Sequence, residues 1–412
     1  RKGHCNAEGV FPLTEVDEVA VYQCSKQGYY VGSQKRGCVL GATDGEWEKA
    51  NGLNPNDPAD AALDLDGDGI SNLDEFRRGT SISSTDTDGD GIPDNVELAN
   101  GYDPLVFTRI VYVDAARPDD SGNGGSEAAA KKSIKGAVNV SKTLFENVIL
   151  VKPGTYTGVD NYGINFGGYD IKIRSLGNAG NTIIDLEGNG PFITLNSGES
   201  ANSWLDGFTV RNGYAASYGI ALYLNNAGMD IRNCIFENNN SGKLVRYEYG
   251  EGMYEEYWED ANMTAAVYAQ GRPIRVTNTI FRNNTSRETM YGGEGGNSGA
   301  LNLVSCRGTV IDNCLFTGNR GYGAGAIVMA GGEVEITNSR FLNNHSFYNG
   351  GAISGSYNYY SYDDSRPNVL TMKNCLLLGN RAVYDYSDLY MYYFQTNLYN
   401  VTIANGSSRD GR

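Results

Sequence analysis

Two short acidic segments carry the most specific chemical signal in this 412-residue chain. Residues 64–75 read Asp-Leu-Asp-Gly-Asp-Gly-Ile-Ser-Asn-Leu-Asp-Glu, and residues 86–97 read Asp-Thr-Asp-Gly-Asp-Gly-Ile-Pro-Asp-Asn-Val-Glu. Both match the calcium-loop template, with acidic ligands at positions one, three and five, a carbonyl at seven, an optional ligand at nine and a bidentate Glu at twelve. The predicted Ca²⁺ ligands are Asp64, Asp66, Asp68, Ile70, Asn72 and Glu75, then Asp86, Asp88, Asp90, Ile92, Asp94 and Glu97. The alternative is a hydrated acidic linker. A linker of that kind gives no reason for the same pattern to occur twice.

Aromatic side chains form a second candidate site. The chain has 29 tyrosines, and nine aromatic residues crowd two segments: Tyr247, Tyr249, Tyr254, Tyr257, Trp258, Tyr357, Tyr359, Tyr360 and Tyr362. Tyrosine combines flat apolar area with a polar tip, which suits sugar stacking or protein docking. The alternative is that these segments pack on themselves over the surface of the protein.

Other residue types give little support for catalysis. The only histidines, His4 and His345, lack the spacing of a zinc site. Acidic and basic residues do lie together at 243–260 and at 363–366, which keeps a polysaccharide lyase or hydrolase open. No catalytic residue and no organic cofactor site is predicted.

The elements that must position these residues follow from a repeat. The phrase Asn-x-x-(Phe/Leu/Ile) returns at Asn233, Asn278, Asn313, Asn338, Asn374 and Asn400. A unit of about 25 residues, lengthened in places by insertions, is typical of a solenoid. The segments before each Asn alternate apolar and polar residues, as in 229–232 and 334–337, which predicts strands.

Short strands wound in parallel predict a mainly β fold, a parallel β-helix whose coils stack about 4.8 Å apart. The repeated Asn residues should then form a ladder of amides along the axis. A second set, three residues after the aromatic position, is expected in tight turns because Asn tolerates positive φ. This set comprises Asn239, Asn284, Asn319, Asn344 and Asn380.

Cysteines and insertions follow the same register. Cys234, Cys314 and Cys375 share one phase but are separated by Thr279 and Ser339, so their sulfurs should lie about 9.6 Å apart and stay reduced.

Insertions at 240–264, 285–298, 381–387 and 355–368 interrupt the repeat. They should stack on one side of the coil and gather the nine aromatic residues into a tyrosine crest.

The stretch from Ile110-Val-Tyr-Val-Asp through Val151-Lys-Pro-Gly-Thr-Tyr to Leu205-Asp-Gly-Phe-Thr-Val resembles bacterial right-handed parallel β-helix proteins of the pectate-lyase-like superfamily. The resemblance implies a β-helix domain over residues 107–412, with a helix from Ala128 to Val148 capping the first coil. It does not imply one function, because this fold carries lyases, hydrolases, adhesins and structural walls.

The first hundred residues resemble two other families. Glu48–Gly52, Glu75–Gly79 and Glu97–Gly101 recur around the acidic loops, and residues 43–106 resemble bacterial thrombospondin type 3 repeats, whose first copy here has lost its calcium loop. Residues 1–42 resemble part of a sushi module. That resemblance implies a disulfide between Cys5 and Cys38, with Cys24 reduced.

Composition limits the possible partners. A formal net charge of −16 argues against nucleic acid and anionic membranes, and no apolar run approaches about 18 residues. A chain that starts at Arg1 without Met suggests a processed or truncated piece of a secreted precursor. We therefore expect an extracellular calcium-binding structural or adhesion protein whose tyrosine crest binds glycan or another copy of the chain. The alternatives are a polysaccharide lyase or hydrolase and a glycan-binding module without catalysis.

Overall fold

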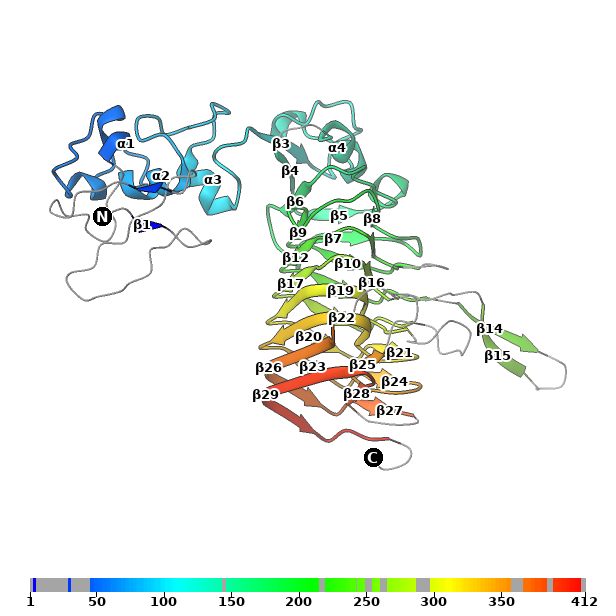
Figure 1. Ribbon diagram of the computed structural model, residues 1–412. Coiled ribbons are helices and arrows are strands. Elements are labelled where there is room, and N and C mark those ends of the chain that lie inside the picture. Colours follow the sequence, from blue (N-terminus) through cyan, green and yellow to red (C-terminus); the bar gives the residue numbers. More distant parts are fainter. Residues whose placement is uncertain are drawn as a thin grey trace. The chain divides into compact units, whose positions relative to one another are not determined.

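The computed structural model describes residues 3–4, 29–30, 45–142, 146–214, 219–241, 243–248, 254–259, 265–286, 297–356, 366–383 and 388–408. The chain divides into two compact units, residues 1–108 and 109–412 (Figure 1). Within the first unit, the two described pieces of residues 1–42 are the strands β1 (Gly3–His4) and β2 (Tyr29–Tyr30), which pair antiparallel. Cys5, Cys24 and Cys38 lie outside the described residues.

The rest of the first unit is built from short helices. They are α1 (Gly45–Ala50), η1 (Asp60–Ala62), α2 (Asn72–Arg78) and α3 (Asp94–Asn100). Each α-helix is followed within two residues by a glycine with positive φ, at 79° for Gly52, 86° for Gly79 and 75° for Gly101. The residue after each glycine donates its N–H to the carbonyl of Glu48, Glu75 or Glu97. The same helix ending therefore occurs three times, because glycine adopts this left-handed conformation without a Cβ clash.

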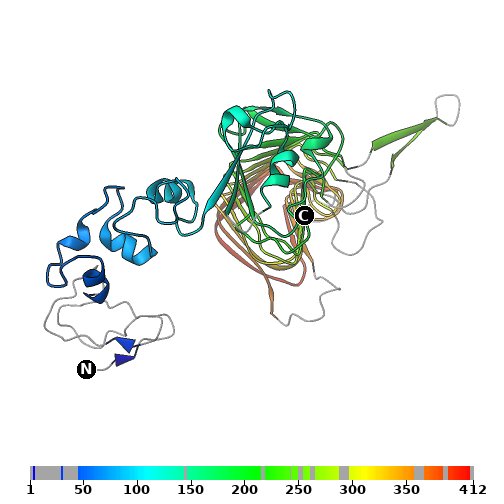
Figure 2. The same ribbon diagram turned by 90° about the horizontal axis from the view of Figure 1, so that it is seen from above.

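The second unit is the predicted parallel β-helix, and its main sheet contains 22 strands. Three strand positions recur in every coil, so three ladders run along the stack. Seen down the stack, the strands of successive coils superimpose around one interior (Figure 2). Each ladder pairs parallel and in register, which fixes the residues that become neighbours along the axis.

The first ladder contains β4 (Glu146–Val151), β6 (Ile171–Ser175), β9 (Trp204–Asp206), β12 (Asp230–Arg232), β17 (Arg275–Thr277), β19 (Leu301–Asp312), β22 (Ile327–Thr337), β26 (Asn368–Leu378) and β29 (Phe394–Ala404). The second contains β5 (Gly154–Tyr156), β7 (Thr182–Asp185), β10 (Thr209–Arg211), β13 (Ile235–Glu237), β18 (Ile280–Arg282), β20 (Leu315–Thr317) and β23 (Arg340–Leu342), followed by the ends of β26 and β29. The third contains β8 (Ile193–Leu195), β11 (Leu222–Asn225), β16 (Val267–Gln270), the starts of β19 and β22, β25 (Ile353–Ser356) and β28 (Leu389–Met391).

A short fourth ladder marks the corner between the second and third ladders. It consists of β21 (Arg320–Gly321), β24 (His345–Ser346) and β27 (Arg381–Ala382). Isolated bridges extend the same line through Tyr214, Asn240 and Thr285 at one end and Ser407 at the other.

The first coil is closed by a shorter helix than the sequence predicted. Strand β3 (Thr108–Val113) leads to η2 (Glu127–Ala129) and then to α4 (Ile134–Val140). Ser133 caps α4 by accepting the N–H of Gly136, and Ile134, Ala137 and Val138 are buried in the core. The prediction of one helix from Ala128 to Val148 was wrong in its bounds, since Val148 lies in β4. The apolar periodicity of a buried strand was read as a continuation of the helix.

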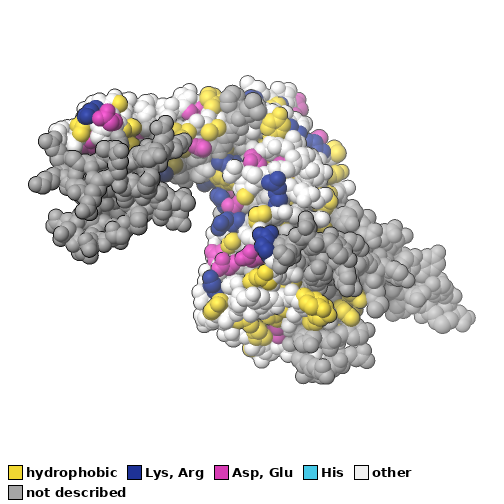
Figure 3. All heavy atoms as spheres, viewed as in Figure 1, with side chains coloured by type: hydrophobic (Ala, Val, Ile, Leu, Met, Phe, Trp, Pro, Cys, Tyr) yellow, Lys and Arg dark blue, Asp and Glu magenta, His cyan; other side chains and the backbone are white. Residues whose placement is uncertain are grey.

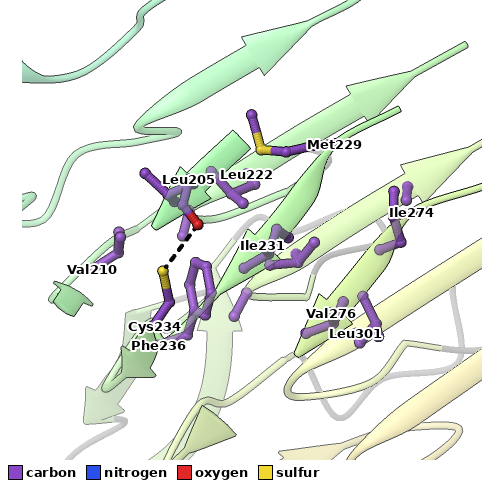
Figure 4. Packing of buried hydrophobic residues seen from close by; sticks show 14 of the residues in the cluster. Leu205, Val210, Leu222, Met229, Ile231, Cys234, Phe236, Ile274, Val276 and Leu301 are labelled. Carbon is purple, nitrogen blue, oxygen red and sulfur yellow. Dashed lines mark hydrogen bonds between the residues drawn. The ribbon is translucent and has the colours of Figure 1, made fainter. Parts of the chain in front are cut away.

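Stacked aromatic rings fill the interior behind the second ladder. The rings of Phe236, Phe281, Phe316 and Phe341 follow one another at centroid distances of 5.0, 4.9 and 4.8 Å and are almost parallel. All four side chains are fully buried. Figure 4 shows Phe236 beside Cys234 and Leu205 in this core. Parallel strands in register bring identical side chains together, and aromatic contact adds to the free energy gained by burying them.

The asparagines form two ladders, and the sequence misassigned one of them. The repeated Asn residues do form an exposed ladder, in which Asn278 donates to Asn233 at 3.2 Å and Asn313 donates to Asn278 at 2.8 Å. It is interrupted at Asn338, which donates to Asp312. These residues have positive φ, 50° at Asn313.

The second set was wrongly expected at positive φ. Asn239, Asn284, Asn319, Asn344 and Asn380 are fully buried. Each of the first four amides donates to the next along the axis at 3.0 Å, and the amide of Asn380 donates to Asp388 at 2.8 Å. The left-handed turn belongs to the residue before each of them, such as Asn283 or Gly318. Every one also donates to a backbone carbonyl of the preceding coil, as Asn319 does to Phe281 at 2.9 Å. A buried amide needs such partners, which explains the continuous ladder.

The cysteine register agrees with the prediction. Cys234, Cys314 and Cys375 are buried free thiols, and so is Cys306. The N–H of Cys234 donates to Oγ1 of Thr279, and the N–H of Cys314 donates to Oγ of Ser339, so hydroxyl residues occupy the coils between them. Each thiol donates to backbone carbonyls, as Cys234 does to Leu205 at 3.5 Å (Figure 4). These cysteines fill the core as small side chains.

Charged side chains of both signs lie side by side along one edge of the coil stack (Figure 3). Charged side chains also pair between neighbouring coils, as Arg211 of β10 does with Asp185 of β7 at 2.9 Å and Lys373 of β26 with Glu335 of β22 at 2.7 Å. Exposed pairs of this kind contribute little stability, about 0 to 1 kcal/mol each. Among the described residues no helix is both long and apolar enough to cross a bilayer.

Candidate metal centres

The first acidic loop brings its three aspartates together. Oxygen atoms of Asp64, Asp66 and Asp68 all lie within 4.8 Å of one another. The backbone holds them there: Asp64 accepts the N–H groups of Gly67 and Gly69, both at 2.8 Å. Gly69 has a φ of 96°, which a side chain would strain, and this explains glycine at the sharp turn of the loop.

The second loop repeats this arrangement. Oxygen atoms of Asp86, Asp88 and Asp90 lie within the same distance, 4.8 Å. Asp86 accepts the N–H groups of Gly89 at 2.8 Å and Gly91 at 2.9 Å. Two independent segments therefore reach one conformation, as expected when both satisfy the same ligand.

Position seven is fixed in the same way in both loops. Ile70 donates its N–H to Oδ1 of Asp68, and Ile92 donates its N–H to Oδ1 of Asp90, each at 2.7 Å. These bonds turn the backbone at the residue whose carbonyl was predicted to bind the cation.

The glutamate at position twelve of the first loop gives the most specific indication that the loop could hold a cation. Glu75 lies in the first half of α2, which begins after the capping residue Ser71. Its side chain is fully buried, and neither carboxylate oxygen has a hydrogen-bond partner among the described residues. Burial, with repulsion from Asp66 and Asp68, raises the pKa of Glu75 to about 7. A buried carboxylate without partners is costly, and a cation facing it would remove that cost.

Glu97 is the corresponding residue of the second loop. It is fully buried, its Oε2 lacks a partner, and its Oε1 accepts the hydroxyl of Thr108 at 3.2 Å. Burial and the charge of Asp90 raise its pKa to about 7. The backbone N–H of Thr108 also donates to Oδ2 of Asp90 at 2.7 Å. The sequence template gave no sign that Thr108 belongs to this site, because it lies outside the loop.

The position-nine residues face other partners. Asn72 donates to the carbonyl of Asp60 at 2.8 Å and accepts the N–H of Leu65 at 3.2 Å. Asp94 accepts the N–H of Thr87 at 2.8 Å. The side chains of Asn72 and Asp94 thus form hydrogen bonds with other parts of the chain. The aspartate clusters and the buried glutamates occupy the other side-chain ligand positions of the template.

The two loops touch within the first unit. Asn95 of α3 donates through Nδ2 to the backbone carbonyl of Asp68 in the first loop. The charge of Asp94 also contributes to the raised pKa of Glu75. The third copy of the helix ending follows α1. The ring of Trp47 in α1 lies 5.0 Å from the ring of Phe76 in α2. This contact packs α1 against α2 within the first unit.

The donor set can be tested against the chemistry of metals. It consists of carboxylates and backbone carbonyls, and neither loop contains a histidine or cysteine. Hard cations with flexible, oxygen-rich coordination suit such a set, whereas zinc prefers nitrogen and sulfur ligands. Oxygens on Asp66, Asp68 and Asp88 are also buried without partners, so the residues present fit Ca²⁺.

The tyrosine crest is described only in part. Tyr247 lies in β14 (Lys243–Glu248) and Tyr254, Tyr257 and Trp258 lie in β15 (Tyr254–Glu259), which pair as an antiparallel hairpin (Figure 1). Tyr249, Tyr357, Tyr359, Tyr360 and Tyr362 fall outside the described residues. The hairpin register sets Lys243 opposite Glu259 and Arg246 opposite Glu256, so these acidic and basic residues alternate as cross-strand partners.

The expectation that all insertions leave from one side needs correction. Segments 240–264, 285–298 and 381–387 follow the fourth ladder, at the corner before the third. Segment 355–368 instead joins β25 to β26, at the corner between the third ladder and the first. The two aromatic groups of the tyrosine crest are thus anchored at different corners of the coil.

Comparison with known proteins assigns no family to this chain. No protein-family model matches the sequence, and no curated protein matches it. Among solved structures, a rhamnogalacturonan lyase is similar with a TM-score of 0.28 and 12% identity, covering 69% of this chain and 73% of the other. A likeness this distant supports no statement about activity.

Proposed function

We propose that this chain is a calcium-binding structural or adhesion protein of the extracellular surface or matrix. In this proposal residues 43–106 form a connector of thrombospondin type 3-like repeats that Ca²⁺ stiffens, and residues 107–412 form a stalk. The two aromatic groups of the tyrosine crest, each at its own corner of the coil, then bind glycan or another copy of the chain. The observation that carries the proposal is the fully buried carboxylate of Glu75, which has no partner beside Asp66 and Asp68.

Electrostatics support the proposed binding of a cation. The first loop holds Asp64, Asp66, Asp68 and Glu75, and repulsion among them is part of what raises the pKa of Glu75. A divalent cation would reverse the sign of this interaction and give the buried oxygens of Glu75 a partner. Extracellular calcium modules bind at about 10⁻⁴ to 10⁻³ M, a concentration range compatible with a structural role outside the cell.

The β-helix suits a rigid spacer. Its buried Asn ladder and its stacked Phe rings run along the axis, so each coil holds its neighbours through side chains as well as through strand pairing. Such a solenoid gains stability through nearest-neighbour contacts and can present ligand-binding segments at its corners.

The experiment is a calorimetric calcium titration of the whole chain, with the same titration of D66A and D88A. We expect two sites in the parent chain, loss of one in each variant, and no change in D160A, which removes an exposed carboxylate elsewhere. Absence of calcium binding at millimolar concentration would reject the proposal.

A further inference from the structure

Thr108 connects the second acidic loop to the first strand of the β-helix. It is the last residue of the first unit and the first residue of β3. Its backbone N–H donates to Oδ2 of Asp90 at 2.7 Å. Its hydroxyl donates to Oε1 of Glu97 at 3.2 Å and lies 3.5 Å from the carbonyl of Val106. Asp90 and Glu97 stand at positions five and twelve of the calcium template, so one residue outside the loop bridges two of its predicted ligands.

The equivalent oxygens of the first loop are not held in this way. Oδ2 of Asp68 and both carboxylate oxygens of Glu75 are buried without a hydrogen-bond partner among the described residues. In the second loop only Oε2 of the Glu97 carboxylate is in that state, because Thr108 holds Oε1 of Glu97 and Oδ2 of Asp90. The two loops therefore share one sequence pattern but differ in how their ligands are fixed.

The spacing of the repeat shows how Thr108 comes to lie there. Asp86 follows Asp64 by 22 residues, and Thr108 follows Asp86 by the same interval. Thr108 thus stands where a third loop would begin, but the chain enters β3 at this residue instead. Val111 and Val113 of β3 are buried in the core of the β-helix. A restraint on the backbone of Thr108 is therefore also a restraint on the start of that strand.

The contacts of Thr108 leave room for a cation. A carboxylate oxygen has two lone pairs, so it can accept a hydrogen bond and still bind a metal ion. Partners of this kind orient the ligands of a metal site, and the loss of one typically lowers metal affinity by about 10- to 100-fold. The fully buried Oε2 of Glu97 has no other partner among the described residues and is available to the cation.

We propose that Thr108 is a positioning residue of the second calcium site, and that calcium in this loop, unlike calcium in the first, holds the N-terminal end of β3. Thr108 is not itself a ligand. It orients Asp90 and Glu97, and a cation that fixes these two carboxylates also fixes the acceptors of both hydrogen bonds from Thr108. The coupling is reciprocal, because two groups that stabilise one another must each favour the other's bound state. The inference rests on the calcium-binding part of the proposed function.

Calcium titration of whole chains tests the role of the hydroxyl. The D66A background leaves the second site, and T108V then removes the hydroxyl but keeps a branched side chain of similar size. We expect D66A/T108V to bind Ca²⁺ about tenfold more weakly than D66A, and D66A/T108S, which keeps a hydroxyl, to bind like D66A. The matched control is D66A/T80V. Thr80 is as buried as Thr108, at 5% against 4% exposed, and its hydroxyl has no partner among the described residues.

Hydrogen exchange tests the link to β3 in chains that keep Thr108. Peptides that span Thr108 are followed by mass spectrometry with and without Ca²⁺. We expect calcium to slow their exchange about threefold or more in D66A, which retains the second site, and to leave it unchanged in D88A, which retains the first. This measurement does not depend on the folding of any Thr108 variant.

Each outcome decides a different point. Unchanged or tighter binding by D66A/T108V, or a loss as large in D66A/T108S or D66A/T80V, overturns the positioning role. Equal slowing of exchange in D66A and D88A, or none in D66A, overturns the link to β3. If the parent chain binds calcium and D66A binds none, the second loop is not a site and the first loop alone carries the proposed function. If the parent chain binds no calcium at millimolar concentration, the inference and the proposed function fail together.

Discussion

The side-chain amide of Asn284 donates to Oδ1 of Asn319 at 3.0 Å inside the β-helix, where both residues are fully buried. The backbone N–H of Asn284 donates to the same oxygen at 3.1 Å. Asn319 in turn donates to Phe281 O and to Asn344 Oδ1. One amide thus satisfies groups on the coils before and after its own, which links three successive coils and ties the register of each coil to the next.

Replacing Asn319 with Leu should destabilise the β-helix by about 3 kcal/mol or more. The change removes four hydrogen bonds, so the backbone N–H of Asn284 and one N–H of its side-chain amide lose their buried acceptor, at about 1 to 3 kcal/mol for each unsatisfied group. Urea unfolding followed by far-ultraviolet circular dichroism measures the loss.

The exposed ladder provides the matched control for that substitution. Asn313 has a φ of 50° and donates to Asn278 at 2.8 Å, so Asn313→Gly removes the amide while keeping a residue that tolerates this conformation. We expect it to cost less than about 1 kcal/mol. Equal losses for N313G and N319L would contradict the distinction between the two ladders.

These ladders also show what the sequence could and could not predict. The repeat of Asn and Phe predicted the solenoid and the alignment of equivalent residues, because strand pairing fixes the axial neighbours. It did not say which Asn points inward, since both a turn and a buried ladder favour this residue type. The left-handed conformation falls on Asn283 and Gly318, one residue earlier than the buried Asn, and a shift of one residue reverses inside and outside.

The candidate metal centres were predictable to a different degree. The six-position pattern located the aspartates and Glu75, because ligand geometry dictates their spacing within a short loop. Thr108 and Asn95 could not be found this way, since each reaches its loop through tertiary packing.

Without calcium, the first unit should lose stability as the pH rises. The pKa of Glu75 is raised from its ordinary value of 4.5 to about 7, so between these values the folded chain binds more protons than the unfolded chain. Its stabilising contribution is complete below about pH 4.5 and is lost as the pH rises through about 7. Thermal unfolding in EDTA at pH 5, 6 and 7 should show a falling midpoint, and excess Ca²⁺ should abolish the fall.

The reporter for that experiment is Trp47, whose ring meets Phe76 of α2. Replacing Trp204 and Trp258 with Phe leaves Trp47 as the only tryptophan, so its fluorescence follows the first unit. Glu75→Gln should reduce the pH dependence in EDTA, since an amide does not titrate, and Glu97, whose pKa is also raised to about 7, should supply the remainder. A midpoint in EDTA that rises from pH 5 to 7 would contradict the assignment.

Asn95→Ala should weaken calcium binding in the first loop although Asn95 belongs to the second repeat. The change removes the hydrogen bond from Asn95 to the carbonyl of Asp68, worth about 0.5 to 1.5 kcal/mol, or roughly twofold to tenfold in affinity. Titration in the D88A background isolates the first site. Asn100→Ala, which alters an exposed amide of the same helix, is the control, and equal effects of the two would argue against coupling.

The coil cysteines should resist thiol reagents until the β-helix unfolds. Burial raises the pKa of Cys234, Cys306 and Cys314 to about 12, and it also raises that of Cys375. Few thiolates therefore form at neutral pH. Mass spectrometry after labelling with iodoacetamide should find these four cysteines modified only in denaturant. Peptide mapping of the same sample without reduction tests the predicted bond between Cys5 and Cys38.

Cys314→Ser should be tolerated, costing about 1 kcal/mol or less, because the equivalent position carries Ser339 and Thr279 in the adjacent coils. Both hydroxyls donate to a carbonyl two residues earlier, the bond that Cys314 makes to Asp312. A loss as large as that of N319L would show that the thiol has a role beyond packing.

Deleting residues 243–260 should leave the coil folded and remove binding by the hairpin part of the tyrosine crest. The flanking residues are held independently, since Ser241 donates its N–H to Thr285 and Ala266 donates its N–H to Gly299. The stack can therefore close without β14 and β15, and the unfolding midpoint should stay within a few degrees of the parent. Light scattering and retention on immobilised glycans measure the two proposed functions of the crest. A deletion variant that still self-associates and still binds glycan would exclude the hairpin as the binding segment. Release of unsaturated sugars from acidic polysaccharides by the parent chain would favour a lyase over a structural protein.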